Sequence, residues 1–209
     1  MVVVEKDDSC QFVDRRITMR KFERQVDDFI EREDEYRKAG IICQKLDFPH
    51  FEFAFLAKYS YMHKDDENPP VQLFRPYPFF LFAVRIDYTN YDILAPSIRI
   101  IDPFTSEITS AAIPCPIVIA PSQQNNKSIL DAKFKVQNQN ILLKDNKGHF
   151  FICLRGIREY HEHPQHNGDS WFLHRLTGKG DILNILDQLQ LYSVSNFNRS
   201  FEQQIKLGY

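Results

Sequence analysis

The sequence predicts an α+β fold: an N-terminal helix, an antiparallel β-meander and C-terminal helices. Two observations carry this prediction. Apolar residues recur at helical spacing near both ends of the chain, whereas in the middle they alternate with other residues, as they do in strands. The links between the alternating runs are short, and short links join antiparallel neighbours.

Length and charge limit the class of protein. The 209 residues are expected to form a single domain, 1–209, with one core. A net charge of −2 with interspersed signs gives no basic field, so we expect no nucleic-acid partner. The start MVVVEKDD is too short and acidic for a signal peptide, and no apolar run is long enough to span a bilayer. We therefore expect a cytoplasmic protein without a membrane partner.

The cysteines do not predict a disulfide framework, because they lie far apart and form no CxxC pair. They are Cys10, Cys43, Cys115 and Cys153.

The first helix is predicted from Thr18 to about Lys38, with charged residues between its apolar positions. The apolar positions are Met19, Phe22, Val26, Phe29, Ile30 and Tyr36. Thr18 is a suitable cap for its start, and Gly40 can supply the positive φ at which helices often end.

Three strands are expected next. Phe51, Phe53 and Phe55 alternate with Glu52 and Ala54, which predicts a strand with one wetter face. The charged turn HKDDENPP separates it from a long strand with five large side chains of one parity. These are Phe80, Phe82, Val84, Ile86 and Tyr88. After a turn at 89–91, a third strand carries Ile98 and Ile100 and is closed by Asp102-Pro103.

Residues 104–140 read as a variable insertion, because prolines interrupt AAIPCPIVIAP and SQQNNKS is polar. A short strand at 141–143, the turn KDNKG and the strand HFFICL follow. Gly180-Asp181 is a plausible start for the closing helix. Its apolar stripe is Ile182, Ile185, Leu186 and Leu189, and a shorter helix after Ser195 would carry Phe197, Phe201 and Ile205.

The stretch from Gly148 to Arg175 holds Cys153, most of the histidines and the one tryptophan. On an extended strand, residues two apart share a side, so Glu159, His161 and His163 would form one row. A carboxylate and two imidazoles suit zinc, and the Cys153 thiolate would complete a tetrahedral site. Without an ion, Glu159 would instead fix the tautomer of a histidine that acts as acid or base.

Cys153 is alternatively a nucleophile, for which positive charge from Arg155, Arg158 or a protonated histidine would favour the thiolate. The two roles compete, because a thiolate in a closed metal site cannot also attack. His166, in the polar turn PQHNGDS, is expected to be a solvated loop residue. Four downstream residues are expected to support the loop beside Cys153, namely Asp169, Trp171, His174 and Arg175.

Two resemblances extend this interpretation. The alternating run from Phe80 to Tyr88, the Pro96-x-Ile98-x-Ile100 segment, Ile152-Cys153-Leu154 and the following Trp171 resemble the ubiquitin-conjugating enzyme fold over roughly residues 18–192. That resemblance implies a cysteine that forms a thioester with a ubiquitin-like protein.

The stretch GHFFICLRGIREYHEHPQHNGDSWFLHR also resembles a predicted metal-binding family named for a Cys, a Glu and two His. Cys153, Glu159, His161 and His163 stand at the matching positions. That family occurs in bacterial gene neighbourhoods for ubiquitin-like modification. The resemblance implies a ubiquitin-like protein, an activating enzyme and a deconjugating peptidase as pathway partners, and a role in antiviral defence.

The leading hypothesis is a transferase of the conjugating-enzyme type. It would carry the modifier on Cys153, use His161 or His163 to take the acceptor's proton, and need no cofactor. The alternative is a non-catalytic or ligase-like accessory protein that binds zinc through Cys153, Glu159, His161 and His163. A third reading is a binding module that recruits the activating enzyme and has a degenerate site.

Overall fold

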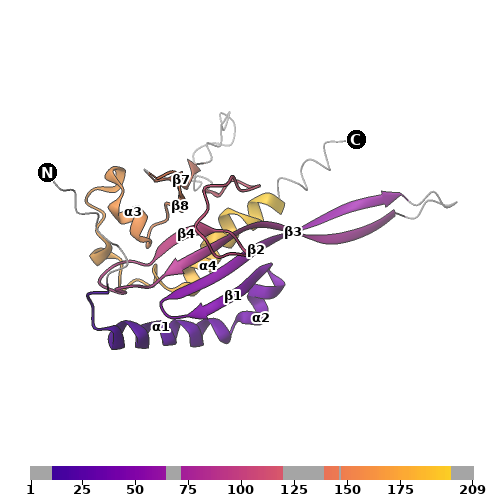
Figure 1. Ribbon diagram of the computed structural model, residues 1–209. Helices are drawn as coiled ribbons and strands as arrows, with labels where there is room; N and C mark the ends of the chain where they lie inside the picture. The colour runs from indigo at the N-terminus through magenta and orange to yellow at the C-terminus, as the bar shows by residue number, and fades with distance from the viewer. Residues whose placement is uncertain (1–10, 65–71, 120–138, 146, 199–209) are drawn as a thin grey trace, which may run out of the picture.

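The computed structural model describes residues 11–64, 72–119, 139–145 and 147–198, and it confirms the α+β prediction. A six-stranded antiparallel sheet has the strand order β1-β2-β3-β4-β8-β7, and helices lie at both ends of the chain (Figure 1). The strands are β1 Ile41–Asp47, β2 His50–Lys64, β3 Gln72–Asp87, β4 Ser97–Ile101, β7 Leu142–Lys144 and β8 Phe150–Ile152. The outer halves of β2 and β3 project beyond the neighbouring strands as a long hairpin (Figure 1).

The single predicted N-terminal helix is two helices, α1 Arg15–Ile30 and α2 Glu33–Lys38, because the backbone turns at residues 31–32. Thr18 is not the cap. Asp14 caps α1 by accepting a hydrogen bond from the Arg16 N–H, and Thr18 is buried one turn into the helix. Gly40 has φ +91°, as expected for the residue that ends the helical segment.

The N-terminal helix α1 and the closing helix pack on the same core. Phe22 of α1 lies 4.3 Å from Phe51 of β2 between ring centroids, and Phe29 lies 5.1 Å from Phe53. The closing helix α4 Ile182–Tyr192 starts after Asp181 and buries Ile182, Ile185, Leu186 and Leu189, as predicted. The Ile182 N–H donates to Gln25 of α1 at 2.7 Å, so the first and last helices are fixed to each other.

The predicted parity of the long strand is wrong at one position. Phe55 pairs with Phe82 but Leu56 pairs with Phe80, which leaves Leu81 as an extra residue in β3. This β-bulge reverses the side-chain alternation. Leu81 is therefore fully buried, whereas Phe80, which was predicted to face the core, is 40% exposed.

The prediction that one face of β2 is exposed to solvent is also wrong at Glu52, which is 2% exposed. Its carboxylate accepts hydrogen bonds from Arg85 Nε at 2.8 Å and Ser106 Oγ at 2.6 Å. The turn after β4 therefore covers this face of the sheet, and the buried charge is paired.

The insertion 104–140 starts with that turn and ends in a separate two-stranded ladder of β5 Val118–Ile119 and β6 Gln139–Asn140. Residues 120–138 lie outside the described residues, as do Cys10, most of the predicted turn HKDDENPP, Phe201 and Ile205. Residues 194–198 are helical, in line with the helix expected after Ser195.

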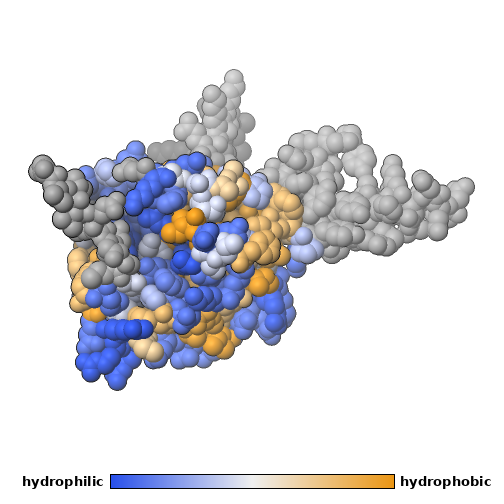
Figure 2. All heavy atoms as spheres, viewed as in Figure 1, coloured by the Kyte–Doolittle hydropathy of each residue, from blue (hydrophilic) through white to orange (hydrophobic). Residues whose placement is uncertain are grey.

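Polar residues cover much of the surface in Figure 2, and apolar residues gather where the β2–β3 hairpin leaves the body. Phe79 and Phe80 of β3 are among the exposed apolar residues. Among the described helices, none combines the length and the apolar character that crossing a bilayer requires.

Candidate functional site

Cys153 directly follows the short strand β8, near the edge of the sheet. Its N–H donates to the Ile141 carbonyl at 2.8 Å, which fixes the backbone at the point where β8 ends. The residue is 8% exposed. It lines a cavity of about 470 Å³, to which Ile119 and Gln139 of the insertion also contribute. The insertion therefore forms part of the wall of the Cys153 cavity.

The extended row predicted after Cys153 does not form. Gly156 adopts φ +101°, the chain turns, and residues Arg158–Glu162 form the short helix α3. Residues two apart on a helix point in different directions rather than to one side. The prediction that Glu159, His161 and His163 share a row is therefore wrong, because it assumed an extended backbone.

Glu159 points into the protein, and its side chain is only 9% exposed. Its carboxylate accepts hydrogen bonds from Ser97 Oγ and, at 3.3 Å, from the Ile98 N–H, and Arg99 Nε lies 3.5 Å away. Burial raises the pKa of Glu159 above its usual range. These contacts join α3 to β4. The Glu159 carboxylate therefore binds residues of the scaffold, whereas a histidine partner was predicted for a site without a metal ion.

Both ring nitrogens of His161 have backbone partners. Nε2 accepts the Gly156 N–H at 3.2 Å, so Nδ1 carries the proton and donates to the Asp169 carbonyl at 2.7 Å. Burial lowers the pKa of His161, which keeps this neutral form at physiological pH. His163 accepts the Gln165 N–H through Nδ1 at 3.3 Å. The structure thus uses His161 to fold the loop and does not bring it to Cys153.

The four residues of the zinc prediction are not gathered at one point. In the part of the chain that the structure describes, no group of three His, Cys, Asp or Glu residues is placed to hold a metal ion. Zinc prefers four such ligands in a tetrahedral arrangement. The geometry therefore gives the zinc prediction no support.

His166 is the histidine that contacts the thiol, although a solvated loop position was predicted for it. Its Nε2 lies 3.5 Å from Cys153 Sγ. The 3₁₀ turn η1 Pro164–His166 brings the chain back towards the end of β8. A signal for this turn was Pro164 directly after His163, because proline suits the first position of a helical turn.

The electrostatics of this pair favour uncharged partners. Burial, and then the nearby Glu159 charge, raise the pKa of the Cys153 thiol. Burial lowers the pKa of the His166 imidazole. Between these two titrations the pair is a thiol beside a neutral imidazole, and the imidazole can accept the proton when the sulfur attacks.

Of the four predicted supporting residues, three make hydrogen bonds within the loop or to a neighbouring segment, and Arg175 makes a ring contact. Asp169 accepts hydrogen bonds from Tyr160 Oη at 2.9 Å and from His174 Nε2, and these bonds lower its pKa to about 2. Trp171 is buried and donates from Nε1 to the Asp92 carbonyl at 2.7 Å. Arg175 lies over the Phe172 ring, 5.4 Å from its centroid. Asp169, Trp171 and His174 therefore hold this loop through hydrogen bonds, whereas Arg175 contacts a neighbouring ring.

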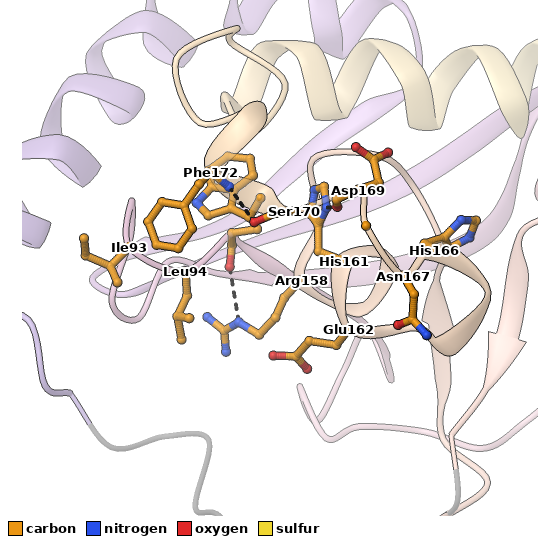
Figure 3. Close-up of a pocket in the computed structure, with 13 residues that line it drawn as sticks. Ile93, Leu94, Arg158, His161, Glu162, His166, Asn167, Asp169, Ser170 and Phe172 are labelled. Atoms are coloured by element: carbon orange, nitrogen blue, oxygen red, sulfur yellow. Dashed lines mark hydrogen bonds between the residues drawn. The ribbon is translucent and has the colours of Figure 1, made fainter.

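A second cavity of about 300 Å³, shown in Figure 3, shares the lining residue His166 with the first. Arg158, His161 and Glu162 of α3 line it together with the loop from His166 to Phe172. Arg158 is buried and donates to the Ala95 and Thr89 carbonyls at 3.2 and 2.9 Å. His166 contributes to the lining of both cavities.

Comparison with known proteins identifies the chain's relatives. Residues 13–197 match the model of the Y4jH-like family. A curated relative, described as uncharacterized protein y4jH from Sinorhizobium fredii, is 31% identical in an alignment that covers 95% of this chain and 93% of the relative. The resemblances to the Cys-Glu-His-His family and to the conjugating-enzyme fold remain predictions. On the extent of these two matches, the chain belongs to the Y4jH-like family.

Proposed function

We propose that this protein carries a ubiquitin-like protein as a thioester on Cys153 and passes it to an acceptor in a bacterial modification pathway. The observation that carries the proposal is the 3.5 Å contact between Cys153 Sγ and His166 Nε2 at the wall of a cavity. Covalent acyl transfer requires a nucleophile and an adjacent base that takes its proton, and a thiol beside an imidazole provides both.

In the first step, an activating enzyme presents the C-terminal carbonyl of the modifier as a thioester. Cys153 Sγ attacks the carbonyl carbon while its proton moves to His166 Nε2. The bond to the activating enzyme's sulfur breaks, and that sulfur takes the proton from His166. One thioester replaces another, so the reaction needs positioning and charge stabilisation rather than a source of energy.

Charge stabilisation falls to the cationic side chains of the same wall. Lys179 and Arg155 line the Cys153 cavity, and positive groups aimed at a developing oxyanion lower the barrier of acyl transfer. Arg155 is held by Asp169, with Nε 3.2 Å from Oδ2. Lys179 Nζ lies 3.5 Å from His174 Nδ1.

In the second step, the acceptor's amine or hydroxyl attacks the thioester on Cys153. The acceptor reaches the thioester through the Cys153 cavity, where His166 takes its proton as the C–S bond breaks and then returns the proton to Sγ. His166 thus replaces His161 and His163 in the role predicted for them. The order of the elements, with the cysteine after the last strand of the antiparallel sheet and before the closing helix, also supports the proposal.

The test is to express the chain together with the genes that surround it and to measure its intact mass. We expect an added mass the size of a small protein, which a thiol reductant removes. Cys153→Ser should convert it to a reductant-resistant ester, and Cys153→Ala should abolish it. The proposal is rejected if wild type forms no adduct, or if the adduct persists in Cys153→Ala.

A further inference from the structure

The imidazole of His166 needs support from outside its own turn. It lies on the three-residue turn η1, and its ring is only partly buried. A side chain on such a short turn has several rotamers open to it, and a base is effective only within hydrogen-bond reach of the proton it takes. The contact with Cys153, at 3.5 Å, therefore depends on what holds the ring in place.

Tyr160 of α3 supplies a flat surface for this ring. The centroids of Tyr160 and His166 are 3.9 Å apart, and their planes differ by 18°. The ring of His163, by comparison, lies 5.7 Å from His166 at 48°. A stacked pair restricts the imidazole to the plane of its partner, so the orientation of Tyr160 determines where Nε2 points.

The orientation of Tyr160 is in turn fixed through its hydroxyl. Oη donates to Asp169 Oδ2 at 2.9 Å, and Arg155 Nε and Nη2 lie 3.4 Å from Oη. The other oxygen of Asp169 accepts from His174 Nε2. Asp169 is therefore held by three side chains from two segments, and Tyr160 cannot rotate without breaking a charge-assisted hydrogen bond.

We propose that Tyr160 is the positioning residue for the Cys153–His166 pair, and that Asp169 fixes Tyr160. The inference deepens the proposed function and rests on it, because it states which residues keep the transfer site ready. Its test uses the reactivity of the thiol alone. It needs neither a ubiquitin-like protein nor an activating enzyme, so its failure is distinguishable from failure of the proposed pathway role.

The experiment measures the rate at which iodoacetamide alkylates Cys153, resolved by mass spectrometry of the peptide that contains it. At pH 7.5 this rate depends on His166, whereas at pH 10 it depends on direct ionisation of the thiol. Tyr160→Leu should lower the rate at pH 7.5 by about two- to tenfold, the range that corresponds to loss of an aromatic pair, and leave the rate at pH 10 within about twofold. Tyr160→Phe keeps the ring, loses the hydroxyl and should give a smaller fall.

Two controls show whether Tyr160 acts through His166. Tyr36 of α2 also donates its hydroxyl to a carboxylate, that of Asp187 at 2.9 Å, but lines neither cavity, so Tyr36→Leu is a matched substitution that should leave both rates unchanged. In a His166→Gln background, Tyr160→Leu should have no further effect at pH 7.5. The proposal is overturned if Tyr160→Leu reacts like wild type, if both rates fall equally, or if the effect persists without His166. Should the leucine variant not fold by circular dichroism, a wild-type rate in Tyr160→Phe overturns it.

Discussion

Replacing His166 with glutamine tests the chemistry of the site most directly. Glutamine keeps a polar side chain of similar length but cannot take a proton. The ordinary pKa of a thiol is 9.0, and burial raises that of Cys153. At pH 7 less than about one thiol in a hundred is therefore ionised without help, which corresponds to a free energy of at least about 2.7 kcal/mol. The imidazole removes much of this barrier by accepting the proton as the sulfur attacks.

The sign of the pH dependence follows from the two shifts. Because burial lowers the pKa of His166 below 6.5, the imidazole is already a neutral base at pH 6.5. As the pH is raised, the wild-type alkylation rate should therefore increase up to about pH 6.5 and stay constant through neutral pH. Above pH 9 it should increase again as the thiol ionises. His166→Gln should lose the flat region, with a fall of about a hundredfold at pH 7, the lower end of general-base contributions.

The assay is iodoacetamide alkylation of the Cys153 peptide from pH 5 to pH 10.5. His163→Gln is the matched control, because His163 lies in the same loop and contacts Gln165 instead of the thiol. Its profile should match that of wild type. A flat neutral region that survives in His166→Gln, or one that disappears in His163→Gln, would show that the base has been assigned to the wrong histidine.

Three further predictions concern the scaffold. Glu159→Gln should retain thioester formation, and its free energy of unfolding should be within about 1 kcal/mol of the wild-type value or higher, because an ionised carboxylate is disfavoured at this buried position. If the substitution abolished the adduct, or released a bound metal, the predicted role of Glu159 as a metal ligand would be restored. Gly156→Ala should destabilise the protein by about 1–3 kcal/mol in urea unfolding, because φ is +101° and the new Cβ would lie 2.5 Å from the Lys179 carbonyl; Gly168→Ala, with φ +96° and open space, should cost less. Asp169→Asn should lower the melting temperature at neutral pH. That difference should shrink as the pH falls from about 3.8 through about 2, where wild type also loses its carboxylate, and a constant difference would contradict the role of the charge.

The sequence was sufficient to predict the layers of the fold. Phe51, Phe53 and Phe55 alternate along one strand, and the predicted stripe of the closing helix is buried as expected. Such periodicity indicates which face of an element packs on the core, because the same alternation of apolar and polar residues recurs over many positions. It could not locate the bulge at Leu81, since one extra residue changes the parity without changing the composition of the strand.

Prediction of the site was less complete, for a related reason. Cys153 was identified correctly as a residue at the end of a strand, but its partner was sought at spacings of two. Gly156 turns the chain into α3, and the contact with His166 closes a loop of thirteen residues. A contact of that kind depends on tertiary geometry rather than on local period, and a single sequence holds little information about it.

In the resting protein, the Cys153–His166 pair is a neutral thiol beside a neutral imidazole, and this has a chemical advantage. A thiolate is the form that attacks thioesters, but it is also the form that oxidises. Cys153 is 8% exposed, and its raised pKa keeps the proton on the sulfur at physiological pH. The sulfur becomes nucleophilic when His166 takes that proton, and this transfer is favourable once an acyl carbon is within reach of Sγ. We therefore expect Cys153 to resist hydrogen peroxide at pH 7.5 while reacting with an activated modifier. Rapid oxidation of the unliganded protein would show that the thiol is already ionised at rest, and the neutral-pair account of its chemistry would have to be abandoned.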